Sequence, residues 1–191
     1  MSGQVILLSG PPGAGKSTVA RLLADEFSSS VHLHTDDFYG YIRRGSVLPY
    51  LPEAQHQNDV VTKVIATAAF GYAAGGYDVV CDGVLGPWFL DAFRHSGNEI
   101  AVHYVVLRPD EETTVARAVD RGEDALTEED PVREMHRQFA DLGQWENHAV
   151  DSGELDADAT ATVVLAGIAR GAYRLPNPAC PPVLGGNTLL R

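Results

Sequence analysis

The sequence predicts an α/β domain built on a five-stranded parallel sheet, and two observations support this prediction. Segments with strand character alternate with segments with helical character over about residues 4–170, which is typical of a parallel sheet with helical crossovers. In addition, residues 10–17 read GPPGAGKS, a glycine-rich segment between an apolar run and a helical pattern. Ligands of doubly wound sheets bind at the carboxyl ends of the strands, so we expect the functional residues there.

The first half of the chain contains three predicted strands. An apolar run predicts a buried strand at about 4–9, and the helical pattern after the glycine-rich segment extends to about residue 27. Alternating residues in 31–35 predict the second strand, which a short helix follows. The prolines and glycine of 44–55 predict an irregular loop. The next predicted elements are a helix at 56–75 and a strand at 77–82.

The second half of the chain begins with a predicted helix near 88–96 and the strongest strand pattern, at 100–107. Pro109 and the three acidic residues after it are typical of a helix N-terminus, and this helix is expected to end near Gly122. The remaining predicted segments are a helix at 128–141, a short strand at 148–150, a helix at 156–170 and a proline-rich C-terminal tail at 171–191.

Composition and charge restrict the class of partner. The chain has 14 basic and 26 acidic residues, a net charge of −12, and no run rich in lysine or arginine. A nucleic acid is therefore disfavoured as the main partner. No apolar stretch of about 18 residues is present, and the N-terminus runs directly into the first strand, so we expect a cytoplasmic protein with no membrane contact. Cys81 and Cys180 form no disulfide framework. A monomer and a homodimer are both compatible with the sequence.

The glycine-rich segment fits the Walker A pattern G-x-x-x-x-G-K-[ST]. Backbone N–H groups around the start of the following helix would form a nest for phosphate oxygens, and the helix dipole adds to it. Lys16 is expected to reach the β- and γ-phosphates, and the Ser17 hydroxyl to bind Mg²⁺. The residues expected at the phosphates are Gly10, Gly13, Ala14, Gly15, Lys16, Ser17 and Thr18. The alternative, a turn that matches the pattern by chance, fits poorly between a strand and a helix.

Aspartates follow two of the predicted strands. Asp36 comes directly after the second strand, where a carboxylate can orient an acceptor hydroxyl and take its proton. Asp37 is the better candidate for a helix cap, and it is a further candidate for substrate contact. Asp82 closes an apolar strand and resembles a Walker B element, so it could hold Mg²⁺ or bind the acceptor. The alternative for Asp82 is a turn aspartate before Gly83.

Two pairs of arginines, each four residues apart, follow the strongest strand. Arg117 and Arg121 share one helix face, as do Arg133 and Arg137. Guanidinium groups aimed at phosphates stabilise the charge that moves in phosphoryl transfer. Alternatively, the four arginines form weak surface ion pairs. The acidic residues available for such pairs are Glu111, Asp120, Glu128, Glu129 and Glu134.

Aromatic residues and arginines gather in the segments expected to surround an acceptor. These residues are Tyr39, Tyr41, Arg43, Arg44, Tyr50, Trp88 and Phe89. Aromatic side chains that line a cleft suit an acceptor with a ring, although each could equally belong to the core. Tyr39, Arg43 and Trp88 are our candidates for substrate contact. The histidines show no metal-ligand spacing, and His32 and His34, on one strand face, are expected to be packed rather than functional.

Taken together, these residues resemble the small P-loop kinases. GPPGAGKST followed by TDDFYGYI is similar to the pattern of uridine kinases, chloramphenicol phosphotransferases and polynucleotide kinases. The resemblance implies a three-layer P-loop NTPase sandwich with a helical lid, and it implies that Asp36 is the general base.

The region around 115–143 is similar to the lid of gluconate kinases and adenylate kinases. This likeness implies that Arg117 lies near the adenine and Arg121 faces the phosphates, with a lid at about 122–145. Residues 150–153 resemble the adenine-side loop of those families, which implies nucleotide contact by Ser152 and Gly153. Two features depart from the pattern: the lid is acidic, and the loop 44–58 matches no family.

The sequence therefore predicts an ATP- and Mg²⁺-dependent kinase that transfers the γ-phosphate to a hydroxyl of a small molecule. The catalytic residues would be Lys16, Asp36 and Arg121. An antibiotic, a sugar or sugar acid, and a nucleoside all remain candidates for the acceptor. A kinase for nucleotide or polynucleotide ends and a non-catalytic nucleotide-binding or switch module are the alternatives.

Overall fold

The computed structural model describes residues 2–94, 100–119 and 129–176. Its centre is a five-stranded, all-parallel sheet in the order β2-β3-β1-β4-β5. The strands are β1 (Val5–Ser9), β2 (Ser30–His34), β3 (Asp78–Asp82), β4 (Val102–Leu107) and β5 (Ala149–Val150). The predicted fold class is confirmed, and each of these strands lies within two residues of its predicted position at both ends.

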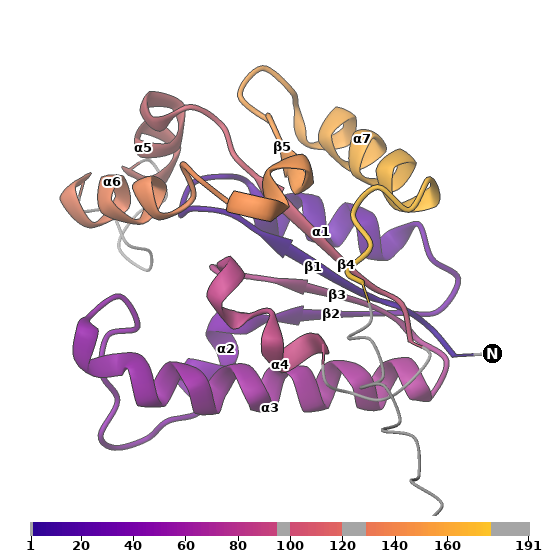
Figure 1. Cartoon of the computed structure of the whole chain (residues 1–191), viewed down its shortest axis with the longest axis horizontal. Coiled ribbons are helices and arrows are strands. Elements are labelled where there is room, and N and C mark those ends of the chain that lie inside the picture. Colours follow the sequence, from indigo (N-terminus) through magenta and orange to yellow (C-terminus); the bar gives the residue numbers. More distant parts are fainter. Residues whose placement is uncertain (1, 95–99, 120–128, 177–191) are drawn as a thin grey trace, which may run out of the picture.

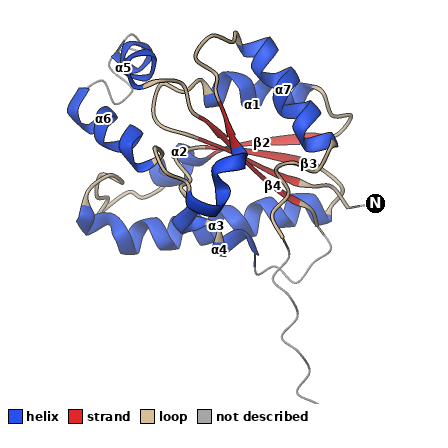
Figure 2. Ribbon diagram, turned by 45° about the horizontal axis from the view of Figure 1, so that its top comes forward, coloured by secondary structure: helices blue, strands red, loops and turns tan. Residues whose placement is uncertain are grey.

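Helices cover both faces of the sheet, which makes a three-layer molecule (Figure 2). On one face, α1 (Lys16–Asp25) and α7 (Ala157–Ala169) pack on an apolar cluster that includes Ile6, Leu8 and Val105. On the other face, α3 (Gln55–Ala74) and α4 (Asp91–Arg94) pack on a cluster that includes Leu7 and Tyr104. The side chains of β1 are fully buried, because both of its faces are covered.

Three further helices lie near the carboxyl end of the sheet (Figure 1). They are α2 (Thr35–Gly40), α5 (Glu111–Val119) and α6 (Glu129–Gln138). The structure differs in detail from the prediction in two regions. In the predicted loop 44–55, Pro52–Ala54 forms a short 3-10 turn, and in the predicted helix near 88–96, Pro87–Phe89 forms another. The helix predicted near 88–96 is therefore a 3-10 turn followed by the single turn of α4. A third 3-10 segment, Gly143–His148, leads into β5.

The segment after α7 continues to pack on the sheet. Tyr104 N donates to Tyr173 O at 2.9 Å, and Leu175 N donates to Val102 O at 2.8 Å. Residues 173–175 thus run antiparallel to the first half of β4, which β5 is too short to cover. Tyr173 and Leu175 are buried. Packing therefore extends beyond residue 170, where the tail was expected to begin, and residues 177–191 lie outside the described part of the chain.

No helix among the described residues is long and apolar enough to cross a membrane.

Candidate active site

The glycine-rich loop joins β1 to α1 in the conformation that a phosphate-binding loop requires. Gly13 and Gly15 have φ values of 84° and 86°, a backbone region that side chains other than glycine rarely adopt. A Cβ atom on Gly13 would lie 2.2 Å from Thr114 O, so the loop also packs directly against α5. Gly15 precedes the first residue of α1, and Val19 N donates to its carbonyl at 3.1 Å. The loop therefore ends at a helix N-terminus, a position that favours the binding of an anion.

Lys16 and Ser17 lie at the first turn of α1. Lys16 is 7% exposed, and its Nζ donates to Pro11 O at 2.8 Å, which folds the side chain back over the loop. Ser17 Oγ donates to Asp82 Oδ2 at 2.6 Å. This bond brings together the two residues that the sequence predicted as metal ligands, from the Walker A loop and the end of β3.

Asp82 is held by two histidines as well as by Ser17. His32 Nε2 and His34 Nδ1 donate to Asp82 Oδ1, at 2.7 and 3.0 Å. Burial of Asp82 raises its pKa, but the hydrogen bonds from His32, Ser17 and His34 outweigh that effect and lower the pKa to about 2. Asp82 is therefore an ionised, fully buried carboxylate at the carboxyl end of β3.

His32 and His34, which were expected to be packed rather than functional, both bind the Asp82 carboxylate. Both side chains project from one face of β2, and the register places His34 beside Asp82. A signal was present in the sequence: a His-x-His strand next to a strand that ends in aspartate. The register between β2 and β3, which brings these residues together, is decided only in the folded sheet.

The two aspartates after β2 are both in the first turn of α2 but occupy different surroundings. The side chain of Asp36 is 74% exposed and lines the main cavity, and Oδ2 lies 3.7 Å from His34 Nε2. Asp37 is exposed and is not among the residues that line the cavity. Neither aspartate caps α2, because the N-cap residue is His34 and no side-chain cap bond forms. Asp36 thus has the access that a general base needs.

One cavity of about 1050 Å³ connects the phosphate-binding loop to Asp36 and to an apolar region. At one end lie Gly13, Lys16 and Ser17, and beside them the buried Asp82. The wall at the other end comes from the loop 48–52, from α3 and from the 3-10 turn at Pro87–Phe89. This arrangement puts the predicted phosphate and acceptor residues around one continuous space.

The loop 48–52 is held in place by two residues of α3 that the sequence did not single out. Gln57 binds both backbone groups of Val47, accepting from its N–H at 2.9 Å and donating to its carbonyl at 2.7 Å. Asn58 Nδ2 donates to Pro49 O at 2.8 Å. These contacts pin an irregular loop against α3, and no pattern in the sequence could have paired them.

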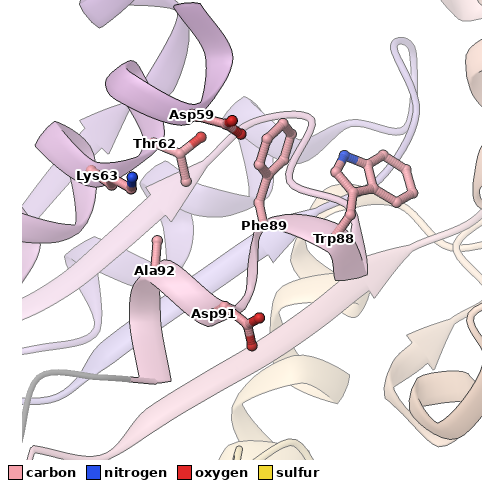
Figure 3. A pocket seen from close by; sticks show the side chains of 7 residues that line it. All are labelled: Asp59, Thr62, Lys63, Trp88, Phe89, Asp91 and Ala92. Atoms are coloured by element: carbon pink, nitrogen blue, oxygen red, sulfur yellow. The ribbon is translucent and has the colours of Figure 1, made fainter. Parts of the chain in front are cut away.

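Trp88 and Phe89 form the aromatic part of this cavity wall. Their ring centroids are 6.0 Å apart, and both also line a smaller cavity of about 460 Å³ against α3, where they lie side by side (Figure 3). The loop before them is anchored at Leu85, whose carbonyl accepts from Ser9 Oγ at 2.7 Å and from Tyr104 Oη at 3.0 Å. The wall therefore rests on β1 and β4.

Arg117 contacts the two other residues for which nucleotide contact was predicted. Its guanidinium donates to Ser152 O at 3.4 Å and to Gly153 O at 3.1 Å. Asp110 fixes the start of the same helix, since Oδ1 accepts from Thr113 N at 2.8 Å. The structure thus joins α5 to the loop after β5. Arg117, Ser152 and Gly153 are not among the residues that line the cavity.

The remaining arginines have different outcomes. Arg133 pairs with Glu111 at 2.6 Å and with Glu129 at 3.4 Å, and Arg137 pairs with Glu134 at 3.2 Å. These contacts agree with the surface ion-pair alternative. Arg43 is exposed and is not among the cavity residues, and Arg121 lies outside the described residues.

Ser17 at the start of α1 and Asp82 at the end of β3 together fit a divalent cation. The Ser17 hydroxyl and the Asp82 carboxylate are adjacent oxygen donors of the type that Mg²⁺ prefers. Mg²⁺ usually takes one or two protein oxygens together with substrate phosphates and water. Within residues 2–94, 100–119 and 129–176, no group of three or more His, Cys, Asp or Glu side chains is arranged to hold a metal ion.

Comparison with known proteins identifies relatives of this chain. The sequence model of the zeta toxin family matches residues 2–141. No curated protein matches the chain at a significant level. Among solved structures, a gluconokinase from Sinorhizobium meliloti 1021 is 22% identical with a TM-score of 0.67, covering 90% of this chain and 94% of that one.

Two further solved structures share the fold. The tunicamycin resistance protein of Deinococcus radiodurans is 16% identical with a TM-score of 0.65, covering 91% of this chain and 99% of that one. A shikimate kinase from Acinetobacter baumannii is 18% identical with a TM-score of 0.59, covering 88% and 94%. At these identities the likeness establishes the fold alone.

Proposed function

The chain belongs to the zeta toxin family of P-loop kinases, and from this membership we propose that it transfers the γ-phosphate of ATP to a hydroxyl of a small molecule. The single observation that carries the proposal is the cavity that holds Lys16, Ser17 and Asp36 in one space with an aromatic wall. Phosphoryl transfer needs little covalent chemistry from a protein but needs both substrates positioned in line. A cavity with a phosphate-binding end and an acceptor end supplies that positioning.

In this proposal the loop at residues 10–17 binds the triphosphate through its backbone N–H groups, and Lys16 contacts the β- and γ-phosphates. Ser17 and Asp82 hold a Mg²⁺ ion, which neutralises charge on the phosphates. Asp36 orients the acceptor hydroxyl and accepts its proton as the oxygen bonds to the γ-phosphorus. The bond from that phosphorus to the bridging oxygen breaks, and ADP leaves. Arg121 remains a predicted contributor to charge stabilisation.

Arg117, Ser152 and Gly153 are proposed to form the adenine side of the nucleotide site. Their mutual contacts support this role, because a rigid loop beside the base fixes the orientation of the nucleotide. Asp37, Tyr39 and Trp88 remain candidates around the acceptor, and of these Tyr39 and Trp88 line the cavity. Closure of the region around 122–145 over the nucleotide would exclude water and suppress ATP hydrolysis.

The first experiment measures ADP release from Mg-ATP with and without a panel of phenicols, aminoglycosides, nucleosides, sugars and sugar acids. Phosphorus NMR on any active mixture should show a new phosphomonoester. Asp36→Asn is expected to leave ATP binding nearly intact but to slow transfer by at least about a hundredfold. Asp37→Asn is the matched comparison, with a smaller effect expected because Asp37 does not line the cavity.

The alternatives give different results in the same assays. A non-catalytic module would bind ATP, show no stimulation by any acceptor and be indifferent to Asp36→Asn. A kinase for polynucleotide ends would show strong loss of activity with added salt, since its substrate carries many phosphates. Lys16→Ala is expected to weaken both ATP binding and transfer.

A further inference from the structure

His32 and His34 both contact the same oxygen of the Asp82 carboxylate. The two residues alternate along β2, so their side chains lie on one face of the sheet, and the register places His34 beside Asp82. His32 Nε2 lies 2.7 Å from Oδ1, and His34 Nδ1 lies 3.0 Å from it. A carboxylate oxygen accepts hydrogen bonds, so each of these ring nitrogens carries the hydrogen. Oδ1 therefore receives two N–H groups from one strand.

The second oxygen of Asp82 faces the phosphate-binding loop. Oδ2 accepts from Ser17 Oγ at 2.6 Å, at the first turn of α1. The Asp82 side chain is fully buried, so bulk water cannot replace the donors that surround it. The two imidazoles thus fix the plane of the carboxylate and leave one oxygen toward Ser17.

The imidazoles are placed to orient a metal ligand rather than to bind a metal themselves. In the described part of the chain, no group of three or more His, Cys, Asp or Glu side chains is arranged to hold a metal ion. His32 is not among the residues that line the cavity. We therefore expect an effect of His32 on a cation beside Ser17 to pass through Asp82.

A carboxylate that offers a single oxygen suits Mg²⁺ better than Ca²⁺. Mg²⁺ requires near-ideal octahedral geometry and binds few protein oxygens, with water and phosphates as its other ligands. Ca²⁺ takes more oxygen ligands in a flexible geometry and binds carboxylates through one or both oxygens. Because Oδ1 is occupied by two N–H groups, binding through both oxygens of Asp82 is disfavoured.

We propose, on the premise that the kinase function above is correct, that His32 and His34 are positioning residues of its metal site. By holding Oδ1, they present Oδ2 of Asp82 alone to a cation beside Ser17. The pair thereby sets the affinity of the site for Mg²⁺ and its preference for Mg²⁺ over Ca²⁺.

Amide substitutions test the pair through the position of the donor. The amide nitrogen of asparagine lies as far along the side chain as Nδ1 of histidine, and that of glutamine as far as Nε2. His32→Gln and His34→Asn should therefore keep the donor to Oδ1, whereas His32→Asn and His34→Gln should remove it. At each position the two variants differ by one methylene group, so each is the folding control for the other.

The measurement is the affinity of the protein–ADP complex for Mn²⁺, determined by electron paramagnetic resonance of the free ion. His32→Asn and His34→Gln should weaken Mn²⁺ binding by at least about tenfold, the scale for loss of a group that orients a metal ligand. His32→Gln and His34→Asn should bind Mn²⁺ nearly as the parent does. ADP affinity without a divalent cation should be similar in the parent and the four variants.

His32 is the decisive position, because His34 also lies 3.7 Å from Asp36 and lines the cavity. Equal Mn²⁺ affinity in His32→Asn and His32→Gln overturns the inference and leaves the kinase function intact. A parallel loss of metal-free ADP binding in His32→Asn would show that the histidine acts on the loop, and it also overturns the inference. If ADP on the parent protein binds Mn²⁺ no more tightly than ADP in solution, the proposed function itself loses its metal site.

Competition of Mg²⁺ and Ca²⁺ with bound Mn²⁺ tests the single-oxygen geometry. In the parent, Mg²⁺ should displace Mn²⁺ at a lower concentration than Ca²⁺ does. In His32→Asn the affinity for Ca²⁺ should fall less than that for Mg²⁺, because Ca²⁺ can use the oxygen that has lost a donor. Equal losses for the two cations would show that the histidines hold Asp82 in place without selecting the cation, and that part of the proposal would be wrong.

Discussion

Asp82 shows how one residue links three elements at the candidate active site. Its two carboxylate oxygens accept from Ser17 on α1 and from His32 and His34 on β2, while the residue itself ends β3. A buried carboxylate is tolerated in an interior only when its charge is compensated by such donors. The network therefore fixes the start of α1 relative to the sheet, at the point where the phosphate-binding loop turns into the helix.

Arg117 is the residue on which the predicted adenine side of the site depends. Because its guanidinium bridges α5 and the loop at Ser152 and Gly153, we expect Arg117→Ala to weaken ATP binding roughly tenfold, the scale of a charge-assisted hydrogen bond. Arg117→Lys should recover only part of the affinity, because lysine cannot bridge two carbonyls with the same geometry.

Calorimetric titration with Mg-ATP measures this effect. Arg137→Ala is the control, because Arg137 is exposed and pairs only with Glu134 in the described residues. If both variants bind ATP as the parent does, Arg117 has no part in the nucleotide site.

His148 makes the stability of the fold depend on pH. Burial lowers the pKa of His148 below its usual value of 6.5, and the hydrogen bond from Nδ1 to Tyr104 O opposes this only in part. The unfolded chain therefore binds a proton more readily than the folded chain. The free energy of unfolding should fall as the pH drops through 6.5 and stop falling below the lowered pKa.

His148→Asn should flatten this part of the stability profile, although it also leaves space among the surrounding rings of Trp145 and Tyr173. Urea unfolding at intervals between pH 7.5 and 5 measures the slope. His56→Asn, at an exposed histidine of α3, serves as the comparison. A slope that is the same in parent and His148→Asn would exclude His148 as the source.

At the scale of elements, α7 meets the segment after it through a glycine. A Cβ atom on Gly167 would lie 2.1 Å from the ring of Tyr173, so no side chain fits unless that ring moves. Alanine is normally better than glycine in a helix by about 1 kcal/mol. We nevertheless expect Gly167→Ala to destabilise the protein by about 1–3 kcal/mol, the range of overpacked cores.

Gly71 in α3 is a matched control for that prediction. Nothing lies within 4 Å of a Cβ atom built there, so Gly71→Ala should show the ordinary helix gain of about 0.5–1 kcal/mol. Denaturant unfolding of both variants shows whether each substitution raises or lowers the free energy of unfolding. If Gly167→Ala is also stabilising, the contact between α7 and Tyr173 is not as close as described.

At the scale of the whole molecule, the question is where the folded domain ends. Tyr173 and Leu175 bury their side chains and complete the edge of β4. A chain that ends after Pro176 keeps both of these residues. A chain that ends after Arg170 should lose the burial of two large side chains, and its Tm should fall by roughly 10 °C.

Thermal unfolding followed by circular dichroism measures both truncations. Tyr173→Ala in the full chain is the finer test. It should lower the Tm as well, but by less than the truncation after Arg170 does. Equal Tm values for the two truncated chains would place the domain boundary at residue 170, as the proline content of 171–191 suggested.

The fold was predictable because its signals are local. The apolar run before the Walker A pattern and the helix after it lie within about twenty residues, and the alternation of elements repeats along the chain. Helix limits were less predictable near residues 87–94, where Pro87 and the turn around it break the helical pattern into short pieces. Local helix propensity cannot decide whether such a segment forms two short turns or a single longer helix.

The phosphate-binding loop, Asp36 and the parallel sheet follow from the sequence by itself, because each depends on residues that are neighbours along the chain or on a pattern that repeats. The tertiary structure decided what depends on distant segments: the pairing of His32 and His34 with Asp82, the contact of Arg117 with the loop after β5, and the apolar wall opposite Lys16. These contacts arise from strand register and helix packing, which distribute segments far apart in the chain around one cavity. The identity of the acceptor depends on that cavity, so it could not be derived from motifs alone.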